Sequence, residues 1–473
     1  MTMMHLHSDL LAQLDAILSS PEGRRIGVLG LGVAGRAMAL YLAERGAVVV
    51  AADLRDALAE DTELSGQLEL RLGEMSEETF ADVEALVISP GAHPDQPAVR
   101  AVREAGKPII GELELLGELP SKVVAITGTN GKSTTTALVG ALISGMGEEP
   151  FVGGNFGEPV ASWVRRGAEA DVAVIELSSF QLETAYRFAP DVSLVLNISH
   201  DHADRYDGLE DYALAKRRVL EGQSPEQTTI LNADDVRVAA MAEHARGQTL
   251  WFSTEAPLGE RDGLYLDGDV AKGAGTLAEM APLPLQHERL VGRHNRQNAL
   301  AALLIAYALG YAADGWDSVM EAYRGFEGLE HRLEWVLESE GVRYINDSKA
   351  TNDVSAGVAL RAVSGGVILL AGGRSKNAGY GALLEAAQSA EVIKVFAFGE
   401  AGPEIHDAFG AAGFQSEVCT GLSHAVERAV AEASSGQCVL LSPACSSFDE
   451  FANYAERGRS FKEFVRDATE GRA

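Results

Sequence analysis

The sequence predicts an α/β fold of three domains, and three observations carry this prediction. The chain has 473 residues, and globular domains usually hold about 100–200 residues. Apolar runs alternate with helix-like segments over residues 24–118 and again beyond 327, which is typical of parallel sheets covered by helices. Between these parts, an apolar run leads through a glycine loop into a helix. We predict a Rossmann-like domain at 1–118, a P-loop ATPase-type domain at 119–327 and a Rossmann-like domain at 328–473.

Composition excludes several classes of partner. The formal net charge of −30 argues against a nucleic-acid partner, which would need a basic face, and against anionic membrane surfaces. The cysteines, Cys419, Cys438 and Cys445, show no CxxC spacing and are predicted to be reduced core residues of a cytosolic protein. The start of the chain lacks the features of a signal peptide, and no apolar run approaches 18 residues. We expect a cytoplasmic monomer without membrane or nucleic-acid partners.

The glycine loop in the middle of the chain reads GTNGKST at residues 128–134. A strand, a glycine loop and a helix N-terminus together offer free backbone N–H groups to an anion, and the helix dipole favours negative charge there. Lys132 can reach terminal phosphates, and the hydroxyl of Ser133 can ligate Mg²⁺. The strict Walker A pattern needs glycine where this chain has Ile126, so the loop is a shortened variant. We predict an ATP site.

A second glycine motif, GxGxxG, lies at residues 30–35 between a predicted strand and a predicted helix, and Asp53 ends the next strand. This is the Rossmann phosphate-binding arrangement. Two interpretations stay open: a nucleotide bound over the turn with Asp53 near its sugar or base, or a glycine turn that only allows close packing. About five strands fit before the ATP loop, so a single nucleotide group is favoured over a dinucleotide.

Carboxylate and imidazole side chains follow two further predicted strands. Glu176 ends one apolar run, and His200, Asp201 and His202 follow the run at 192–199. Ligands of open parallel sheets collect outside the carboxyl ends of the strands. These side chains are therefore candidate ligands for Mg²⁺ or Mn²⁺, although Mg²⁺ prefers oxygen. For each member of the His200–His202 group, a polar loop role is equally well supported.

A long apolar helix is predicted over residues 290–310, with Asn295 and Asn298 near its start. These two residues either cap the helix or hydrogen-bond a base. Residues 325–336 have the glycine and polar content of a linker, which places a domain boundary near 327.

The last third repeats the α/β pattern without a phosphate loop of its own. Ser446 and Ser447 follow the predicted strand in the segment 438–451, which we expect to run into a helix. Their hydroxyls either contact a carboxylate or, with Ser447 and Asp449, cap that helix. A serine hydrolase is disfavoured because neither serine lies in a GxSxG elbow. A C-terminal helix is predicted over 461–471.

Taken together, these motifs resemble the Mur ligase family over nearly the whole chain after the first ~20 residues. The family-wide motifs are TGTNGKST (127–134), Glu176, HDHADRY (200–206) with LAK (214–216), GRHNRQN (292–298), EHRLE (330–334), NDSKATN (346–352) and LSPACSS (441–447). Three segments resemble its D-glutamate-adding members: GLGVAG (30–35), LSSFQLE (177–183) and SPACSSFDEF (442–451).

The resemblance implies an ATP-dependent ligase of cytoplasmic peptidoglycan precursor synthesis. It would join D-glutamate to UDP-N-acetylmuramoyl-L-alanine through an acyl phosphate, with ATP and Mg²⁺ (or Mn²⁺) and a carbamylated lysine at Lys216. Such chemistry needs charge neutralisation more than a nucleophilic side chain. Without the resemblance, Lys216 reads as a surface lysine in a basic run with Arg217 and Arg218.

The resemblance also implies roles for individual residues. The implied catalytic residues are Lys132, Glu176, His202 and Lys216, and the implied metal ligands are Ser133, Glu176, His202 and Lys216. The implied ATP contacts are Gly128, Thr129, Asn130, Gly131, Lys132, Ser133, Thr134, Asn298, Arg332 and Asp347, with His331 beside them and Lys349 as a hinge position. The implied UDP-substrate contacts are Gly30, Gly32, Val33, Ala34, Asp53, Arg55, Asn155, Ser178 and Gln181. The implied D-glutamate contacts are Lys376, Ser447, Phe448 and Tyr454.

Two positions depart from the family pattern. His200 stands where an acidic residue is expected, and Arg374 stands where an acid or a small residue is usual. Three other functions were weighed: another ligase of this family, such as the L-alanine-adding one, an NAD-dependent oxidoreductase, and a nucleotide-binding regulatory protein. The oxidoreductase leaves GTNGKST and NDSKATN unexplained. The regulatory protein leaves the presence of Lys132, Glu176, His202 and Lys216 unexplained.

Overall fold

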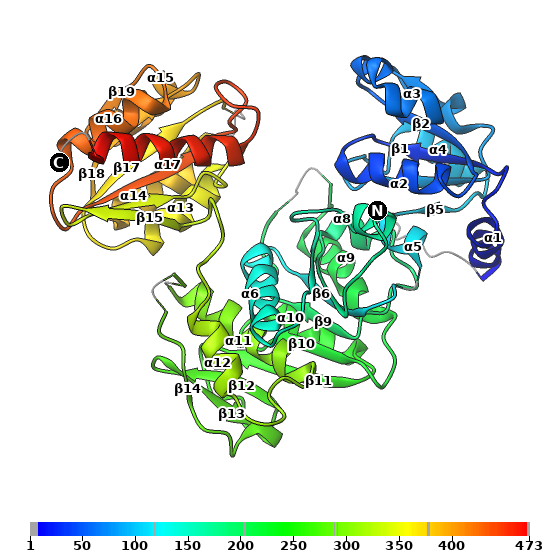
Figure 1. Cartoon of the computed structure of the whole chain (residues 1–473), viewed down its shortest axis with the longest axis horizontal. Helices are drawn as coiled ribbons and strands as arrows, with labels where there is room; N and C mark the ends of the chain where they lie inside the picture. Colours follow the sequence, from blue (N-terminus) through cyan, green and yellow to red (C-terminus); the bar gives the residue numbers. More distant parts are fainter. Residues whose placement is uncertain are drawn as a thin grey trace. The chain divides into compact units, whose positions relative to one another are not determined.

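The computed structural model describes residues 8–117, 119–201, 205–287, 289–290, 292–375 and 379–470. The chain forms two compact units, which are described separately (Figure 1). The first unit contains the chain up to Gln286 together with Arg293–Gly325, and the second contains His287–Gly292 and Phe326–Ala473. The described residues form three separate sheets, two in the first unit and one in the second. This confirms the predicted α/β class with three sheets.

The N-terminal sheet has five described strands, all parallel, in the order β3-β2-β1-β4-β5. The strand order reverses direction at β1, and in such sheets ligands bind at this switch point. The predicted number of about five strands is confirmed. The strands are β1 (Arg25–Leu29), β2 (Val48–Asp53), β3 (Glu69–Leu72), β4 (Ala85–Ile88) and β5 (Ile109–Ile110).

Helices cover this sheet and lead out of it. They are α1 (Ser8–Ser19), α2 (Val33–Ala43), η1 (Asp56–Glu60), α3 (Thr62–Gln67), η2 (Glu77–Phe80), α4 (Pro97–Glu104) and α5 (Glu112–Leu116). The segment RAMALYLAERG (36–46) predicts a helix, and α2 begins three residues earlier, directly after Gly32. Apolar side chains of α1, α2 and the strands form one buried cluster.

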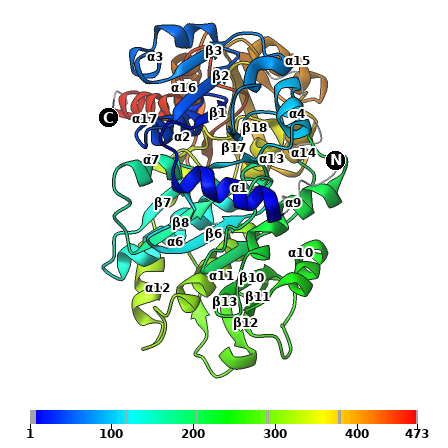
Figure 2. The same ribbon diagram turned by 90° about the vertical axis from the view of Figure 1, so that its right-hand side faces the viewer.

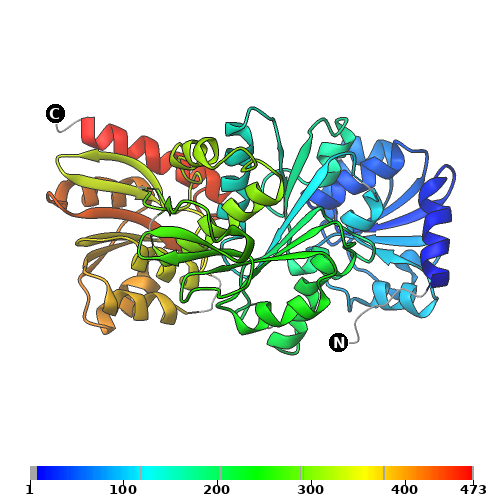
Figure 3. The same cartoon turned by 90° about the horizontal axis from the view of Figure 1, so that it is seen from below.

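The central sheet has nine described strands in the order β14-β13-β12-β11-β10-β9-β6-β8-β7 (Figures 2 and 3). Strands β6 to β12 are parallel, whereas β13 and β14 continue the sheet in antiparallel fashion. The strands are β6 (Lys122–Thr127), β7 (Phe151–Gly154), β8 (Val172–Glu176), β9 (Val192–Val195), β10 (Thr228–Asn232), β11 (Gln248–Ser253), β12 (Gly263–Asp267), β13 (Val270–Ala274) and β14 (Leu283–Pro284).

The helices around this sheet include the two that matter most for the site, α6 and α9. They are α6 (Lys132–Gly145), α7 (Val160–Arg165), α8 (Ser179–Leu182), α9 (Leu209–Glu221), α10 (Val236–Ala240), η3 (Met241–His244), η4 (Gly275–Leu277), α11 (Arg293–Ala308) and α12 (Asp317–Arg324). The segment LEDYALAKRRVLE (209–221) predicts a helix, and α9 has these bounds. Helix α6 packs against α11 and α12.

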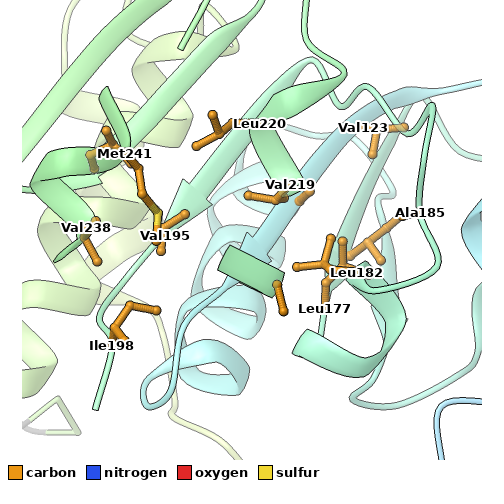
Figure 4. Close-up of a cluster of buried hydrophobic side chains, with 14 of the residues drawn as sticks. Val123, Leu177, Leu182, Ala185, Val195, Ile198, Val219, Leu220, Val238 and Met241 are labelled. Atoms are coloured by element: carbon orange, nitrogen blue, oxygen red, sulfur yellow. The ribbon is translucent and has the colours of Figure 1, made fainter. Parts of the chain in front are cut away.

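One face of the central sheet carries a large apolar cluster (Figure 4). Alternate residues of each strand point to the same face, so Val123 of β6 and Val195 of β9 contribute to it together with Leu182 of α8 and Val219 of α9. Burying such side chains provides the main favourable free energy of folding, about 25 cal/mol per Å² of apolar surface. The cluster therefore fixes α8 and α9 against the strands whose ends carry the candidate site.

The second unit holds a sheet of six described strands in the order β15-β16-β20-β17-β18-β19. Only the β15–β16 pair is antiparallel. The strands are β15 (Glu334–Ser339), β16 (Val342–Asn346), β17 (Val367–Gly372), β18 (Val392–Phe398), β19 (Ser416–Val418) and β20 (Cys438–Ala444), and the helices are α13 (Asp353–Ala362), α14 (Gly381–Ser389), α15 (Gly402–Ala411), α16 (Leu422–Glu432) and α17 (Tyr454–Glu470).

Three predictions for this part of the chain were wrong. Residues 334–336 were interpreted as linker but belong to β15. This strand lies at the edge of the sheet and pairs with β16. The strand β20 does not run directly into a helix, since turns and bends fill residues 447–453. Helix α17 begins at Tyr454, seven residues before the predicted start at 461, and its cap is Asn453, whose Oδ1 accepts from the backbone N–H of Glu456 at 2.9 Å.

Among the residues that the structure describes, no helix has both the length and the apolar character needed to span a membrane.

Candidate active site

The glycine loop joins the end of β6 to the start of α6, at the switch point where β8 and β9 flank β6. Gly128 has φ 148° and Gly131 has φ 88°, a region that favours glycine. Close neighbours reinforce this requirement: a Cβ atom at Gly131 would lie 2.4 Å from Oδ1 of Asn298. Glycine is therefore needed at positions 128 and 131, where the loop turns sharply next to α11.

The end of β9 holds this loop through side-chain contacts that the sequence did not reveal. Asn197 Oδ1 accepts from the backbone N–H of Asn130 at 2.8 Å, and Asn197 Nδ2 donates to the carbonyl of Asn130 at 3.0 Å. Thr129 Oγ1 accepts from the backbone N–H of Ser199 at 3.0 Å. Asn197 is thus a supporting residue that could have been found only from the pairing of β9 with β6.

Lys132 is the first residue of α6 and bends back over the loop. Its ammonium group donates to the carbonyl oxygens of Gly128 and Thr129, both at 2.9 Å. Ser133 and Thr134 are buried in the first turn of the helix. A helix N-terminus with a lysine across it is an anion site, because the free N–H groups and the helix dipole both favour negative charge.

Glu176 and Asn155 lie together at the ends of β8 and β7. Asn155 Nδ2 donates to Glu176 Oε1 at 2.8 Å, and the backbone N–H of Asn155 donates to the carbonyl of Glu176 at 2.9 Å. The second carboxylate oxygen, Oε2, is buried and has no hydrogen-bond partner among the described residues. Burying a carboxylate oxygen without a partner costs free energy. A bound cation would be a suitable partner for this atom.

Lys216 is buried, with 1% of its surface exposed, so its interpretation as a surface lysine was wrong. Its Nζ lies 3.4 Å from Thr127 Oγ1 and 4.6 Å from the centre of the Tyr212 ring. Burial and the positive charge of Lys132 lower the pKa of Lys216 well below its usual value, while Asp201 and Glu176 act in the opposite direction. The amine is therefore more easily deprotonated than an ordinary lysine.

The group after β9 is only partly described. His202 lies outside the described residues, and His200 and Asp201 are exposed. Asp201 is close enough to act electrostatically on both Lys216 and Tyr212. Of the four predicted metal ligands, the structure therefore places Ser133, Glu176 and Lys216 around the end of β6.

The N-terminal glycine turn has the geometry of a phosphate-binding turn. Gly30 has φ 85°, and a Cβ atom at Gly35 would lie 1.7 Å from the carbonyl oxygen of Gly30. Gly32 precedes α2, Ala34 lies in its first turn, and Val33 is 76% exposed at its start. Such an exposed apolar side chain beside free helix N–H groups is suited to contact a ligand.

Asp53 and Arg55 lie at the end of β2 beside this turn. Asp53 forms two bonds of 2.8 Å with the Arg55 guanidinium, and the pKa of Asp53 falls to about 2, mainly because of Arg55. Of the two interpretations of the glycine turn, close packing applies to Gly35, because a side chain there would collide with the Gly30 carbonyl. The role of Asp53 near a sugar or base stays a prediction.

Ser178 and Gln181 form a capping box at the N-terminus of α8. The Ser178 hydroxyl accepts from the backbone N–H of Gln181 at 3.2 Å, and Gln181 Oε1 accepts from the backbone N–H of Ser178 at 3.0 Å. Both residues follow the end of β8 and so lie on the same stretch of chain as Glu176.

Asn295 and Asn298 lie inside α11, at its third and sixth residues, and both are buried. Asn298 Nδ2 donates to Asn295 Oδ1 at 3.1 Å. The capping interpretation was therefore wrong, since a cap precedes the first turn. A contact of these residues with a base stays a prediction, and Asn298 lies directly against Gly131 of the phosphate loop.

In the second unit, Asp347 and Arg332 lie at the carboxyl end of β16 and before β15. Asp347 Oδ2 accepts from Ser442 Oγ at 2.8 Å, Oδ1 accepts from the backbone N–H of Leu333 at 3.2 Å, and burial raises the pKa of Asp347 to about 7. Arg332 stands between two left-handed residues, His331 (φ 64°) and Leu333 (φ 46°). Strain of this kind costs of order 1–3 kcal/mol per residue and is often found at functional sites.

The imidazole of His331 is held below this turn. Its Nδ1 lies 3.0 Å from Asn346 Nδ2, its Nε2 is buried without a hydrogen-bond partner among the described residues, and burial lowers the pKa of His331. The backbone N–H of Lys349 donates to the His331 carbonyl at 3.0 Å. The EHRLE and NDSKATN motifs, separated in sequence, are thus joined in the structure.

The predicted D-glutamate residues lie beyond β20. Ser447 is buried and Phe448 is 63% exposed, while Tyr454 begins α17 and its ring meets the His331 ring edge to face. The Asp449 carboxylate accepts from the backbone N–H of Glu400 at 3.0 Å, so the predicted capping role of Ser447 and Asp449 was wrong. Lys376 lies outside the described residues.

Arg374 and Ser446 are joined through a short two-residue bridge. The backbone N–H of Arg374 donates to the Ser446 carbonyl at 2.9 Å, and the Ser446 hydroxyl donates to the Arg374 carbonyl at 3.0 Å. The Arg374 side chain forms two bonds of 2.9 Å with Glu400. The unusual arginine is therefore paired with a carboxylate on the protein surface.

A buried arginine of α17 supports the loops of this edge. The Arg457 guanidinium donates to the carbonyls of Ser348 at 2.9 Å and Cys445 at 3.1 Å, and to that of Gly372 at 3.4 Å. Burial lowers the pKa of Arg457 to about 10. One side chain thus ties together the loops that follow β16, β17 and β20.

Comparison with known proteins identifies the family. Residues 24–111 match the Mur ligase MurD-like N-terminal domain, residues 126–306 the Mur ligase middle domain, and residues 331–445 the Mur ligase glutamate ligase domain. Similar proteins include those named UDP-N-acetylmuramoylalanine--D-glutamate ligase from Acidobacterium capsulatum, 40% identical over 94% of this chain and 96% of its own length, and from Anaeromyxobacter dehalogenans, 41% identical over 95% of this chain and 99% of its own length.

Solved structures share the fold at lower sequence identity. They include the UDP-N-acetylmuramate-alanine ligase MurC from Thermotoga maritima, with a TM-score of 0.58, 19% identity and coverage of 94% of this chain and 99% of that one. MurF from Acinetobacter baumannii has a TM-score of 0.57 and 16% identity, with coverage of 97% and 98%. Three matched domains in the same order, together with relatives at about 40% identity over almost the full length, show that the chain belongs to the Mur ligase family.

Proposed function

We propose that this enzyme joins D-glutamate to UDP-N-acetylmuramoyl-L-alanine with ATP, as a step of cytoplasmic peptidoglycan precursor synthesis. The observation that carries the proposal is its similarity to relatives that share the name UDP-N-acetylmuramoylalanine--D-glutamate ligase, at 38–41% identity over 94–95% of the chain. The phosphate loop, Glu176 and Lys216 supply the groups that a ligase of this family needs. Family membership implies ATP and Mg²⁺ as the cofactors.

The reaction has two steps with balanced bonds. An oxygen of the alanyl carboxylate attacks the γ-phosphorus of ATP, the bond to the β-γ bridging oxygen breaks, and ADP leaves. The amine of D-glutamate then attacks the carbonyl carbon of the acyl phosphate, inorganic phosphate leaves, and the nitrogen loses a proton to give the amide. Both steps depend on neutralising phosphate charge and on positioning.

Lys132 and the N–H groups at the start of α6 bind the phosphates in this proposal. Mg²⁺, when bound, adds positive charge that stabilises the transferring phosphoryl group. Ser133 and Glu176 would hold it, because hydroxyl and carboxylate oxygens are the ligands that Mg²⁺ prefers, and Glu176 Oε2 is the buried oxygen without a partner among the described residues. His202 belongs to the same proposed set.

Lys216 is proposed to carry a carbamate. Its lowered pKa favours the neutral amine, whose nitrogen can attack CO₂, form an N–C bond and release a proton. The product is an anionic group with two oxygens, which a divalent cation accepts, whereas an ammonium beside the cation would be repelled. Thr127 Oγ1, at 3.4 Å from Nζ, is placed to orient the modified side chain.

The three ligands are assigned to the three proposed domains. Residues 1–118 bind the nucleotide sugar through Gly30, Gly32, Val33, Ala34, Asp53 and Arg55, with Asn155, Ser178 and Gln181 from the next domain. Residues 119–327 bind ATP through the phosphate loop and Asn298, and the family pattern adds Arg332 and Asp347 to the proposed ATP contacts. Residues 328–473 bind D-glutamate through Lys376, Ser447, Phe448 and Tyr454. We propose a cytoplasmic monomer.

Phosphate release tests this function. The purified enzyme is mixed with ATP, Mg²⁺, UDP-N-acetylmuramoyl-L-alanine and one amino acid at a time: D-glutamate, L-glutamate, D-aspartate or L-alanine. We expect phosphate release with D-glutamate alone, and a product whose mass equals the two substrates minus water. Release only when L-alanine is supplied with UDP-N-acetylmuramate would overturn the substrate assignment. A rise of melting temperature with NAD but not with the nucleotide sugar would revive the oxidoreductase.

A further inference from the structure

The buried carboxylate of Glu112 on α5 contacts Gln181, one of the residues proposed to bind the substrate. Glu112, the first residue of α5, is 2% exposed and follows the last strand of the N-terminal sheet. Its Oε1 accepts from the backbone N–H of Ala161 at 2.7 Å, and its Oε2 accepts from Gln181 Nε2 at 3.4 Å. None of the motifs that the sequence brought forward includes this residue.

Gln181 is held at both ends of its amide group. Oε1 accepts from the backbone N–H and from the hydroxyl of Ser178, both at 3.0 Å, while Nε2 donates to Glu112. A rotation of the amide by 180° would place Nε2 against the Ser178 N–H and Oε1 against the Glu112 carboxylate. Both new contacts would join like groups, two donors or two acceptors. Glu112 thus selects one orientation of the amide.

The backbone around Glu112 fixes the distance between these segments. A Cβ atom at Gly111 would lie 2.1 Å from Thr184 Oγ1, and the Gly111 N–H donates to the Thr184 carbonyl at 3.4 Å. The start of α5 therefore lies directly on the segment that follows α8. An amide nitrogen has two hydrogens, and the contact with Glu112 uses one of them, so the second remains as a donor for another acceptor.

We propose that Glu112 is a positioning residue for the nucleotide-sugar substrate: it orients the Gln181 amide and, through it, the Ser178 hydroxyl. This inference rests on the proposed function, because it takes Ser178 and Gln181 as substrate contacts. Glu112 itself does not touch the reacting atoms. Burial raises the pKa of Glu112, against the lowering effect of its two hydrogen bonds, and either protonation state leaves a carbonyl oxygen as acceptor for Gln181.

The neighbouring Glu114 offers a matched control. It lies on the same short helix and is equally buried, but its Oε2 accepts from the backbone N–H groups of Tyr186 at 2.8 Å and Arg187 at 3.0 Å. Glu114→Gln therefore removes a buried carboxylate from α5 without changing the contact with Gln181.

The test is a double-mutant cycle on Glu112→Gln and Gln181→Ala. Glu112→Gln can keep an oxygen toward Ala161 but turns its NH₂ group toward Gln181 Nε2. We expect Kd for UDP-N-acetylmuramoyl-L-alanine, measured by calorimetry, and its KM to rise about five- to tenfold, with KM for ATP unchanged. In the Gln181→Ala background, Glu112→Gln should change Kd less than about twofold, because the two residues act as one unit.

Three results would overturn the inference alone: an unchanged Kd in Glu112→Gln, an equal rise in the Gln181→Ala background, or the same rise in Glu114→Gln. If Glu112→Gln does not fold, Glu112→Asp carries the test. A raised Kd in that variant supports the positioning role, and a wild-type Kd opposes it. If the wild-type enzyme itself fails to bind the nucleotide sugar, the proposed function fails and the inference fails with it.

Discussion

The carboxylate of Asp53 accepts a hydrogen bond from the backbone N–H of Leu31, with 2.6 Å between Oδ2 and the nitrogen. Leu31 is the central residue between Gly30 and Gly32, so the acid at the end of β2 braces the glycine turn after β1. Arg55 holds the same carboxylate from the other side. The Asp53 carboxylate therefore links the glycine turn after β1 to Arg55 after β2.

Removing this brace should weaken nucleotide-sugar binding selectively. We expect Asp53→Ala to raise KM for UDP-N-acetylmuramoyl-L-alanine about tenfold or more, because a hydrogen bond to a charged group contributes roughly 1.5–3 kcal/mol, and to leave KM for ATP unchanged. Steady-state phosphate release measures both constants. Alanine at the exposed Glu60 of η1 is the control, and an equal effect on both KM values in Asp53→Ala would contradict the assignment.

Lys132→Ala should abolish turnover without unfolding the protein. The substitution removes the two hydrogen bonds of the ammonium group to backbone carbonyls of its own loop, and we expect kcat to fall about a hundredfold or more because phosphate charge is no longer neutralised. Melting temperature reports the fold. Lys122→Ala, at the opposite end of β6, should keep wild-type kcat, and a near-normal rate in Lys132→Ala would refute the loop assignment.

Lys216→Ala should be nearly inactive and partly rescued by acetate, which can replace the missing carboxylate oxygens. In the wild-type protein, ¹³C-labelled bicarbonate should produce a carbamate NMR signal that Lys216→Ala lacks. Arg217→Ala is the control, since Arg217 is adjacent in sequence but pairs with Glu221 of the same helix. Unchanged activity, or the same carbamate signal in Lys216→Ala, would end the hypothesis.

Asp347 should make the protein less stable as pH rises. Its folded-state pKa is about 7, above the unfolded value of about 3.9, so the folded state binds more protons between these values. The free energy of unfolding should therefore fall with rising pH across this window, by at most about 4 kcal/mol. Asp347→Asn cannot titrate there.

Urea unfolding between pH 4.5 and 8 tests this expectation. The difference in midpoint between wild type and Asp347→Asn isolates Asp347 from the other acids. The wild type should lose stability relative to the variant as pH rises, and a constant difference would show that Asp347 does not titrate in this range.

The sequence predicted the strand ends of the site well because those strands are apolar and the turns contain glycine. Glu176 was expected at the end of a strand and lies there, beside Asn155, which is 21 positions earlier. The burial of Lys216 could not be predicted in the same way. Tyr212 lies one turn earlier on the same helix, but Thr127 ends β6, and only the packing of α9 against the sheet brings it to Lys216.

Other errors have equally physical causes. Residues 334–336 resemble a linker because they follow a polar, glycine-containing segment, and the edge strand β15 has no fully buried side chain, so its short apolar run does not read as a core strand. Asn197 carries no motif, and its role depends on the adjacency of β9 and β6. The start of α17 was placed too late because its first turn is polar and has an asparagine cap that only the structure displays.

The bonds of Arg457 to three loop carbonyls also bear on how the protein is made. During synthesis, the strands β16, β17 and β20 leave the ribosome before α17, which is the last helix of the second unit. The carbonyls of Ser348, Gly372 and Cys445 can accept these bonds only after α17 has been synthesised. The connection between the ends of these three strands is therefore made late, after the sheet itself can already have formed.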